Sequence, residues 1–144
     1  MRNGLTLVEL LIAVTLASLL GLIAAPRLAR PLASIRVEHE AHRIAAAHTR
    51  ARMLAVSRSR VTLLRIGSDS ITIRSVDGPD TLVEWREPGP AAAGVGLTAP
   101  DRTLLFAPVG ITYGVSNGTW TVSYRGVVRR VIVSRLGRVR IERN

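Results

Sequence analysis

The chain has 144 residues and carries 20 basic side chains, all of them arginine, against 10 acidic ones, which gives a formal charge of +10. No cysteine is present, which excludes disulfides and thiolate metal sites. Apolar residues make up 47% of the chain but aromatic residues only 3%, so part of the apolar content is expected outside a soluble core. A basic surface of this kind points to anionic lipid, acidic protein faces or nucleic acid as partners.

The N-terminal segment is a continuous apolar run from Leu5 to Ala25, interrupted by one charge, Glu9. As a helix it would be about 31 Å long, which matches a hydrocarbon core of about 30 Å. Three interpretations are open: a secretory signal peptide, an unprocessed membrane anchor, and an anchor that is processed near Glu9. The run exceeds the 7–15 residues usual for a signal peptide. An unprocessed anchor would leave a carboxylate in lipid, at a cost of about 2.5–3.5 kcal/mol, without a partner.

The third interpretation rests on the sequence GLTLVEL at residues 4–10. It resembles the processing motif of type IV pilins and type II secretion pseudopilins, although the first mature residue in those families is usually phenylalanine. The resemblance implies a leader of residues 1–4, cleavage after Gly4 by a prepilin peptidase, and N-methylation of Leu5. It also implies that Glu9 pairs with the N-terminal amine of a neighbouring subunit, which would set the register between packed helices. A glutamate that reaches the membrane interface near a helix end is the simpler alternative.

The same resemblance implies a single-pass protein of the bacterial inner membrane, with a transmembrane helix over residues 5–25 and a C-terminal domain in the periplasm. The flanking charges alone, Arg2 before the run and Arg27 and Arg30 after it, favour the opposite orientation, and the motif is given more weight. Pro26 matches a proline common at this place in pilins and is assigned to assembly. Because an interior proline removes a helical hydrogen bond, we expect a kink or local melting near residues 22–27, or the end of the membrane helix there.

Residues 26–58 are predicted to form the exported part of the N-terminal helix. An imperfect apolar stripe at helical spacing supports this assignment; it consists of Ile35, Ile44, Ala47, Ala51 and Leu54. Glu40 and Arg43 are expected to pair on another face of the helix. The segment also holds His39, His42 and His48, for which solvated or packed positions are expected rather than a metal site.

The remainder, residues 59–144, is predicted to be a β-rich globular domain. Strands are expected at residues 61–66, 70–76, 81–86, 103–106, 111–115, 119–124, 127–134 and 138–142. Residues 88–100 are rich in glycine, proline and alanine and are predicted to be a mobile loop. Asn117-Gly118 is typical of a hairpin turn, and Trp120, Val122 and Tyr124 should share one face of their strand.

Three short sequences in this domain carry a second resemblance: FAPVG at residues 106–110, RVIVS at 130–134 and GRVRI at 137–141. They resemble the GspH/FimT family of minor pseudopilins and minor pilins. The fold implied is α+β and type IV pilin-like, with a long N-terminal helix packed on an antiparallel sheet or sandwich. The function implied is a minor pseudopilin of type II secretion for protein export. Its partners would be other pseudopilins or pilins, the prepilin peptidase and an inner-membrane assembly platform.

An alternative function is DNA uptake by a FimT-like minor type IV pilin. Gly137-Arg138-Val139-Arg140 matches the GRxR pattern implicated in that branch, and the last 20 residues carry seven arginines against one acid. Such a patch can hold phosphates without reading bases. The candidate contacts are Arg129, Arg130, Arg135, Arg138 and Arg140. A solvated edge strand protected by its charges explains the same residues.

No motif joins a nucleophile to a base, and no carboxylate pair has a recognisable catalytic context, so neither an enzyme nor a cofactor is predicted. The sequence does not distinguish a secretion system from a pilus or DNA-uptake machine.

Overall fold

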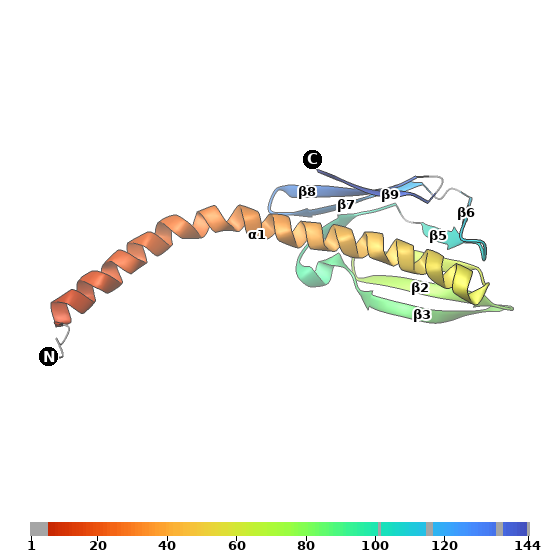
Figure 1. Ribbon diagram of the computed structural model, residues 1–144, viewed down its shortest axis with the longest axis horizontal. Coiled ribbons are helices and arrows are strands. Elements are labelled where there is room, and N and C mark those ends of the chain that lie inside the picture. The colour runs from red at the N-terminus through yellow and green to blue at the C-terminus, as the bar shows by residue number, and fades with distance from the viewer. Residues whose placement is uncertain (1–5, 101, 115–116, 135–136, 144) are drawn as a thin grey trace.

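The computed structural model covers residues 1–144 and describes residues 6–100, 102–114, 117–134 and 137–143, with the backbone alone described for residues 23–28. A single long helix, α1 (Leu7–Arg58), precedes a β-rich domain (Figure 1). The domain contains, in chain order, β1 (Thr62–Ile66), β2 (Ser70–Asp77), β3 (Asp80–Pro88), the 3-10 helix η1 (Pro90–Ala93), β4 (Gly96–Thr98), β5 (Thr103–Phe106), β6 (Thr112–Tyr113), β7 (Gly118–Tyr124), β8 (Val127–Val133) and β9 (Val139–Arg143). The predicted α+β class is confirmed.

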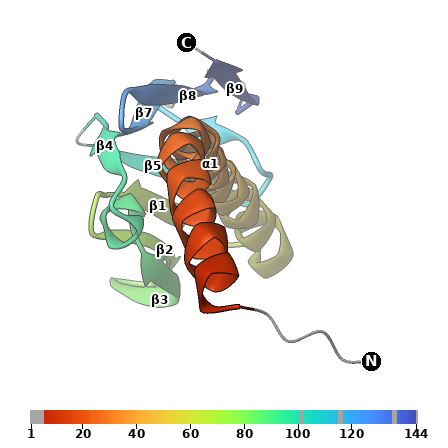
Figure 2. The ribbon, with the colours of Figure 1, turned by 90° about the vertical axis from the view of Figure 1, so that its left-hand side faces the viewer.

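Two antiparallel sheets flank the C-terminal half of α1. The first sheet has the strand order β3-β2-β1-β5-β6 and the second the order β4-β7-β8-β9. Viewed along the helix, β7, β8 and β9 lie on one side of α1 and β1, β2 and β3 on another (Figure 2). One flank of the helix therefore stays open, while both sheets share a single core with its other faces.

The buried stripe of α1 repeats every three or four residues, as a helix face must. It consists of Ala33, Val37, Ala41, Ile44, Ala47, Ala51 and Ala55. Small side chains let the sheets approach the helix backbone closely. The predicted stripe was right for Ile44, Ala47 and Ala51 but wrong for Ile35, which is 67% exposed. Ile35 lies nine residues before Ile44, which is half a turn out of phase.

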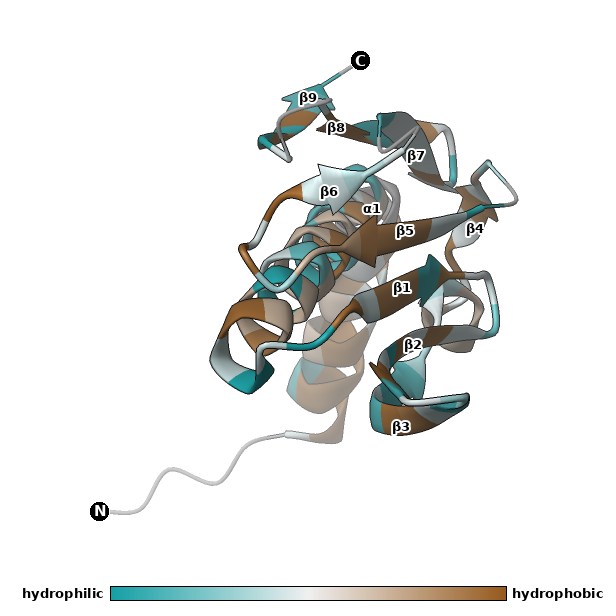
Figure 3. Ribbon diagram, turned by 90° about the vertical axis from the view of Figure 1, so that its right-hand side faces the viewer, coloured by the Kyte–Doolittle hydropathy of each residue, from teal (hydrophilic) through white to brown (hydrophobic). Residues whose placement is uncertain are grey.

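The core between α1 and the sheets is built from the inward residues of alternating strands. The first sheet contributes Leu64, Ile71, Ile73, Leu104 and Phe106, and the second contributes Trp120, Val122, Val131 and Val133. Trp120 and Val122 are buried and Tyr124 packs beside them, which confirms the shared face predicted for β7. Figure 3 shows the apolar colouring of β5 and of the N-terminal part of α1.

The helix runs without a break through residues 22–27, so the predicted local melting is absent from the single chain. Figure 1 shows instead a smooth curve in the N-terminal half of α1. Gentle curvature is common in long helices, whereas a proline more often produces a sharp kink. The side chain of Pro26 lies outside the described residues, and its assembly role stays a prediction.

Two predictions for the β-rich region were wrong. The expected loop at 88–100 contains η1 and β4, because Pro90 starts a helical turn, Gly94 ends it in the left-handed conformation (φ 69°), and Gly96 pairs with Ser123 of β7. Asn117-Gly118 is not a hairpin turn. The strands on either side of it belong to different sheets, since β6 pairs with β5 and β7 pairs with β4 and β8.

Candidate assembly helix and arginine surface

No described residue covers the N-terminal third of α1. Every described side chain from Thr6 to Leu22 is exposed. The large apolar ones are Leu7, Val8, Leu10, Leu11, Ile12, Val14, Leu16, Leu19, Leu20 and Leu22. Among the residues whose side chains are described, no helical stretch is both long and apolar enough to cross a membrane. The predicted span at 5–25 extends beyond these residues at both ends and stays a prediction.

Glu9 lies in the first turn of α1 and closes a capping box with Thr6. The Glu9 amide donates to Oγ1 of Thr6 (3.3 Å), and the Thr6 amide donates to Oε2 of Glu9 (3.4 Å). This reciprocal pair satisfies two amides that a helix start otherwise leaves open. The T-x-x-E spacing at residues 6–9 is the sequence signal of this box, and it could have placed the helix start without a structure. Gly4 and Leu5, the predicted processing residues, lie outside the described part of the chain.

Glu38 of α1 and Arg129 of β8 join the helix to the second sheet. Nε of Arg129 donates to Glu38 at 2.7 Å, Nη2 donates to Oγ of Ser34 at 3.2 Å, and Nη1 donates to the carbonyl of Val128. The hydrogen bond from Arg129 lowers the pKa of Glu38, against a smaller opposing effect of burial. Arg129 is only 5% exposed, so it is not available for the phosphate contact predicted for it: its strand position puts it on the inward face with Val131.

Glu40 and Arg43 of α1 join the helix to the first sheet. Both carboxylate oxygens of Glu40 accept from Nη1 of Arg43 at 2.9–3.0 Å, as predicted for this pair. Nη2 of Arg43 continues to Glu87 (3.0 Å) and to the carbonyl of Pro88 (2.7 Å). Burial alone would lower the pKa of Arg43, but these carboxylates outweigh burial and raise it. Glu40 was expected on an outer face, yet it is 2% exposed, because its charge is neutralised inside this network.

The predicted C-terminal arginine patch is divided in the structure. Arg140 is 70% exposed on β9 but is ion-paired with Glu142 of the same strand, and Arg130 lies directly opposite Glu142. Arg138 is exposed just before β9, where its amide donates to Oγ of Ser134. Arg135 lies outside the described residues. Arg138 and Arg140 are thus the described members of the predicted set that present charge to solvent most openly.

The three histidines lie in different environments. His39 and His42 are 70% and 66% exposed, and each approaches a glutamate at 3.4 Å. His48 is buried against Phe106, with ring centroids 5.0 Å apart in an edge-on arrangement. Burial, and secondarily the charge of Arg52, lower the pKa of His48 to about 4. In the described part of the chain, no three histidine or carboxylate side chains gather as a metal site would require.

A groove of about 780 Å³ runs between α1 and the inner face of β3, and no local sequence pattern predicts it. Met53 and Trp85 form apolar parts of its lining, and the guanidinium of Arg50 lies over the Trp85 ring at 4.8 Å. The groove exists because α1 covers the middle of the first sheet and leaves its β3 edge uncovered.

The family model described as type II transport protein GspH matches residues 40–137, about two thirds of the chain. The chain belongs to the GspH family. This match confirms the predicted GspH/FimT resemblance and covers the sequences at 106–110 and 130–134, while residues 138–141 lie beyond the matched range. No curated protein matches the chain significantly.

Solved structures support the same GspH-type fold. The minor pilin FimU of Pseudomonas aeruginosa PAO1 superposes with a TM-score of 0.62 at 19% identity, over 74% of this chain and 87% of FimU. A second crystal form of FimU gives a TM-score of 0.59 at 18% identity, over 73% and 91%. The minor pseudopilin EpsH of the Vibrio cholerae type 2 secretion system gives 0.60 at 13% identity, over 75% and 97%. At these identities the likeness shows the fold, and the predicted type IV pilin-like architecture is confirmed.

In this GspH-family chain the FAPVG sequence at 106–110 forms the turn after β5 that packs on the end of α1. Gly110 has a φ of 77°, and a Cβ at this position would lie 2.9 Å from Cγ2 of Val56 and 3.4 Å from Nε of Arg52. Its amide donates to the carbonyl of Ala107 at 2.8 Å. Two features of the turn therefore require glycine at position 110: the positive φ of its backbone and its close contact with the helix.

Proposed function

We propose that this chain is a minor pseudopilin that enters the pseudopilus of a type II secretion system. The family match and the fold support a more general role, that of a minor pilin or pseudopilin in type II secretion or type IV pili. The observation that carries the finer proposal is the GspH match over residues 40–137. The first turns of α1 also support the proposal, because they expose apolar side chains that no other described residue covers.

The proposal assigns a sequence of events to the N-terminus. A prepilin peptidase cuts after Gly4, Leu5 is methylated, and residues 5–25 hold the subunit in the inner membrane. The assembly platform then draws the helix out of the lipid and packs it among other pseudopilins, which cover the apolar side chains in place of lipid. The β-rich domain stays in the periplasm as a structural and recognition surface rather than a catalyst.

Glu9 has two roles in this proposal, and they can be separated by mutation. Its carboxylate closes the capping box with Thr6, and its charge pairs with the N-terminal amine of the neighbouring subunit. Glutamine can occupy the same capping position but carries no charge. Thr6→Ala does the reverse, because it removes the capping hydroxyl and keeps the carboxylate.

The test is incorporation into pseudopili in cells that express the other pseudopilins. We expect Glu9→Gln to reach the membrane at wild-type levels but to be lost from sheared pseudopili, while Thr6→Ala is incorporated normally. Immunoblots of matched membrane and filament fractions measure both. Normal incorporation of Glu9→Gln would overturn the charge-pairing role.

Processing is tested separately by mass spectrometry of the purified native polypeptide. We expect the mature chain to begin with a methylated Leu5 and Gly4→Val to remain uncleaved. A native chain that still begins with Met1, or that begins at Pro26, would end the pseudopilin proposal.

A further inference from the structure

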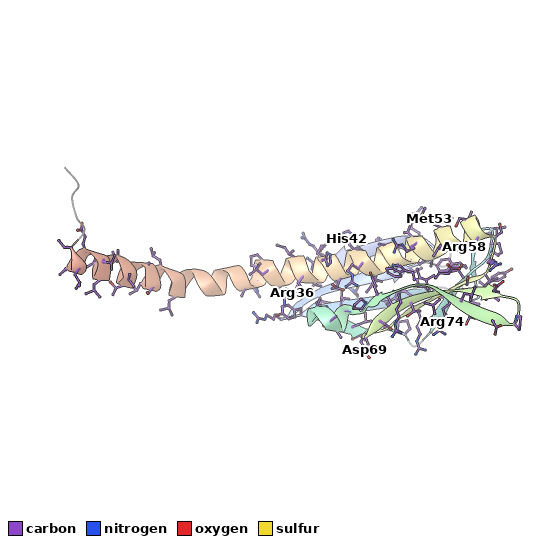
Figure 4. All side chains as sticks on the ribbon, turned by 90° about the horizontal axis from the view of Figure 1, so that it is seen from below. Arg36, His42, Met53, Arg58, Asp69 and Arg74 are labelled. Carbon is purple, nitrogen blue, oxygen red and sulfur yellow. The ribbon has the colours of Figure 1, made fainter. Side chains whose placement is uncertain are left out.

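No described element covers the face of the first sheet that points away from α1. The strand register arranges the side chains of this face in rows across the strands. Figure 4 shows Arg74 and Asp69 on this side of the sheet. One row runs from β3 to β5 through directly opposed residues: Arg86, Thr72, Arg65 and Thr103. Opposed residues are about 5 Å apart, so Arg65 and Arg86 stand about 10 Å apart with the hydroxyl of Thr72 between them.

The next row is apolar except for one arginine. It runs from β3 to β6 as Val83, Arg74, Leu63, Leu105 and Tyr113. Val83 and Tyr113 are 59% and 61% exposed. The two rows are about 7 Å apart along the strands. Arg74 therefore stands diagonally between Arg65 and Arg86, and the three cations border a strip of apolar surface.

This surface is hollowed and strongly positive. A depression of about 570 Å³ is lined by residues of both rows and of the β1–β2 turn. Asp69 is the one carboxylate among the described residues that line it. Arg74 and Arg86 make no ion pair or hydrogen bond within the described chain, unlike Arg43, Arg58 and Arg129, whose charges are met by glutamates. These two cations thus have unused capacity for carboxylate or phosphate oxygens.

We propose that this surface, the arginine face (Leu63, Arg65, Thr72, Arg74, Val83 and Arg86), binds an acidic amphipathic segment of a partner protein. Carboxylates of the segment meet Arg74 and Arg86, and its apolar side chains cover Leu63 and Val83. The inference goes beyond the pseudopilin role, because it concerns the outer face of the first sheet and not the N-terminal turns of α1. It holds whichever machine the subunit joins.

The composition of the face favours a protein over nucleic acid or lipid. Single-stranded nucleic acid is held by aromatic platforms as well as cations, and Tyr113, on the two-residue edge strand β6, is the one aromatic side chain in the two rows. A bilayer surface is flat, whereas the arginines here border a depression. A protein segment supplies both carboxylates and apolar side chains, and its protruding side chains can enter the depression.

The experiment uses the full chain in detergent micelles and a fluorescein-labelled, 18-residue synthetic helix with a leucine stripe flanked by glutamates. Fluorescence anisotropy measures its binding. A peptide with glutamine in place of every glutamate, a dT20 oligonucleotide, and micelles doped with phosphatidylglycerol serve as the competing probes. We expect the acidic helix to bind and the glutamine peptide to bind at least tenfold more weakly.

Variants then locate the binding. Arg74→Ala plus Arg86→Ala should weaken binding of the acidic helix about tenfold, because two exposed charge pairs are lost. Val83→Thr should weaken this binding about twofold with no change in charge. The matched control is Arg138→Ala plus Arg140→Ala, which removes the same charge from the second sheet and should change binding less than twofold. The proposal is overturned by equal effects of both double variants, by absence of acidic-helix binding, or by displacement of the helix from this face by dT20 or phosphatidylglycerol.

Discussion

Nε of Arg129 lies 2.7 Å from a carboxylate oxygen of Glu38, and this pair joins two elements that are 91 residues apart in the sequence. Arg129 is 5% exposed, so its guanidinium is largely desolvated. Its charge is stabilised instead by Glu38 and by the hydroxyl of Ser34. A buried guanidinium without its carboxylate is costly. This ion pair therefore adds a buried polar contact to the apolar core that joins the second sheet to α1.

Glu38→Gln should destabilise the domain by about 2 kcal/mol, the range for a hydrogen bond to a charged group that is left without its counter-charge. Urea unfolding followed by tryptophan fluorescence measures the loss. Glu142→Gln is the matched control, since it removes a carboxylate from the exposed Arg140 and should cost about 0.5 kcal/mol or less. Equal costs for the two variants would show that Arg129 finds another partner. Because Arg129 lowers the pKa of Glu38, this contribution is present above the ordinary pKa of a glutamate and is lost as the pH falls through the lowered pKa of the folded chain.

His48 should make the domain less stable in mild acid. Its pKa is about 4 in the folded chain, where burial and then Arg52 oppose protonation, and about 6.5 when exposed. The unfolded chain therefore binds the extra proton first. Stability is full above about pH 6.5 and declines as the pH falls toward 4, by up to about 3 kcal/mol.

The measurement is the urea midpoint between pH 7.5 and pH 4.5 for the wild type, His48→Leu and His42→Gln. His48→Leu should show a flatter pH dependence because the titrating group is gone. His42 is 66% exposed, so His42→Gln should follow the wild-type curve. A slope that survives in His48→Leu would assign the acid sensitivity to other groups.

Gly110→Ala should loosen the turn that packs on the end of α1. A methyl group there would meet Val56 at 2.9 Å in a backbone with a φ of 77°. Gly126→Ala is the matched control, since Gly126 has a φ of 78° and a Cβ added there would have no neighbour within 4 Å. Both variants carry the conformational cost of about 1 kcal/mol, and Gly110→Ala should add about 1–3 kcal/mol of overpacking. Equal unfolding midpoints would show that Val56 moves aside freely.

Local patterns in the sequence predicted the elements well but not their assembly into two sheets. The bounds of β5 at 103–106 match the prediction, and the switch from helical to alternating spacing falls between Arg58 and Thr62. Asn117-Gly118 led to a wrong prediction. The dipeptide indicates a preference for a tight turn, but it does not determine whether the strands on either side pair with each other. The second sheet depends on the pairing of β4 with β7, which are more than 20 residues apart, and no local pattern contains that information.

In the candidate site, too, local patterns predict some features, while others depend on residues that are far apart in the sequence. The burial of Arg129 could have been predicted, because it shares strand parity with Val131 and Val133. The burial of Glu40 could not, since its network depends on Glu87, which is 47 residues away. The row of Arg65, Thr72 and Arg86 likewise exists only once three strands are in register.

Any binding of DNA by this chain should depend on Arg138 and Arg140 more than on the other predicted arginines. Arg129 is held by Glu38, and both Arg138 and Arg140 are exposed at the β9 end of the second sheet. A chain with a formal charge of +10 will retard DNA at low salt through phosphate contacts. Arg138→Ala plus Arg140→Ala should then weaken binding of every DNA sequence alike. The slope of log affinity against log salt concentration should fall by the amount expected for the loss of about two phosphate contacts. Mobility shifts at several salt concentrations measure this, with Arg60→Ala plus Arg125→Ala as the charge-matched control. Absence of salt-sensitive retardation, or equal losses in the two double variants, would remove DNA uptake through the GRxR sequence as a function of this subunit.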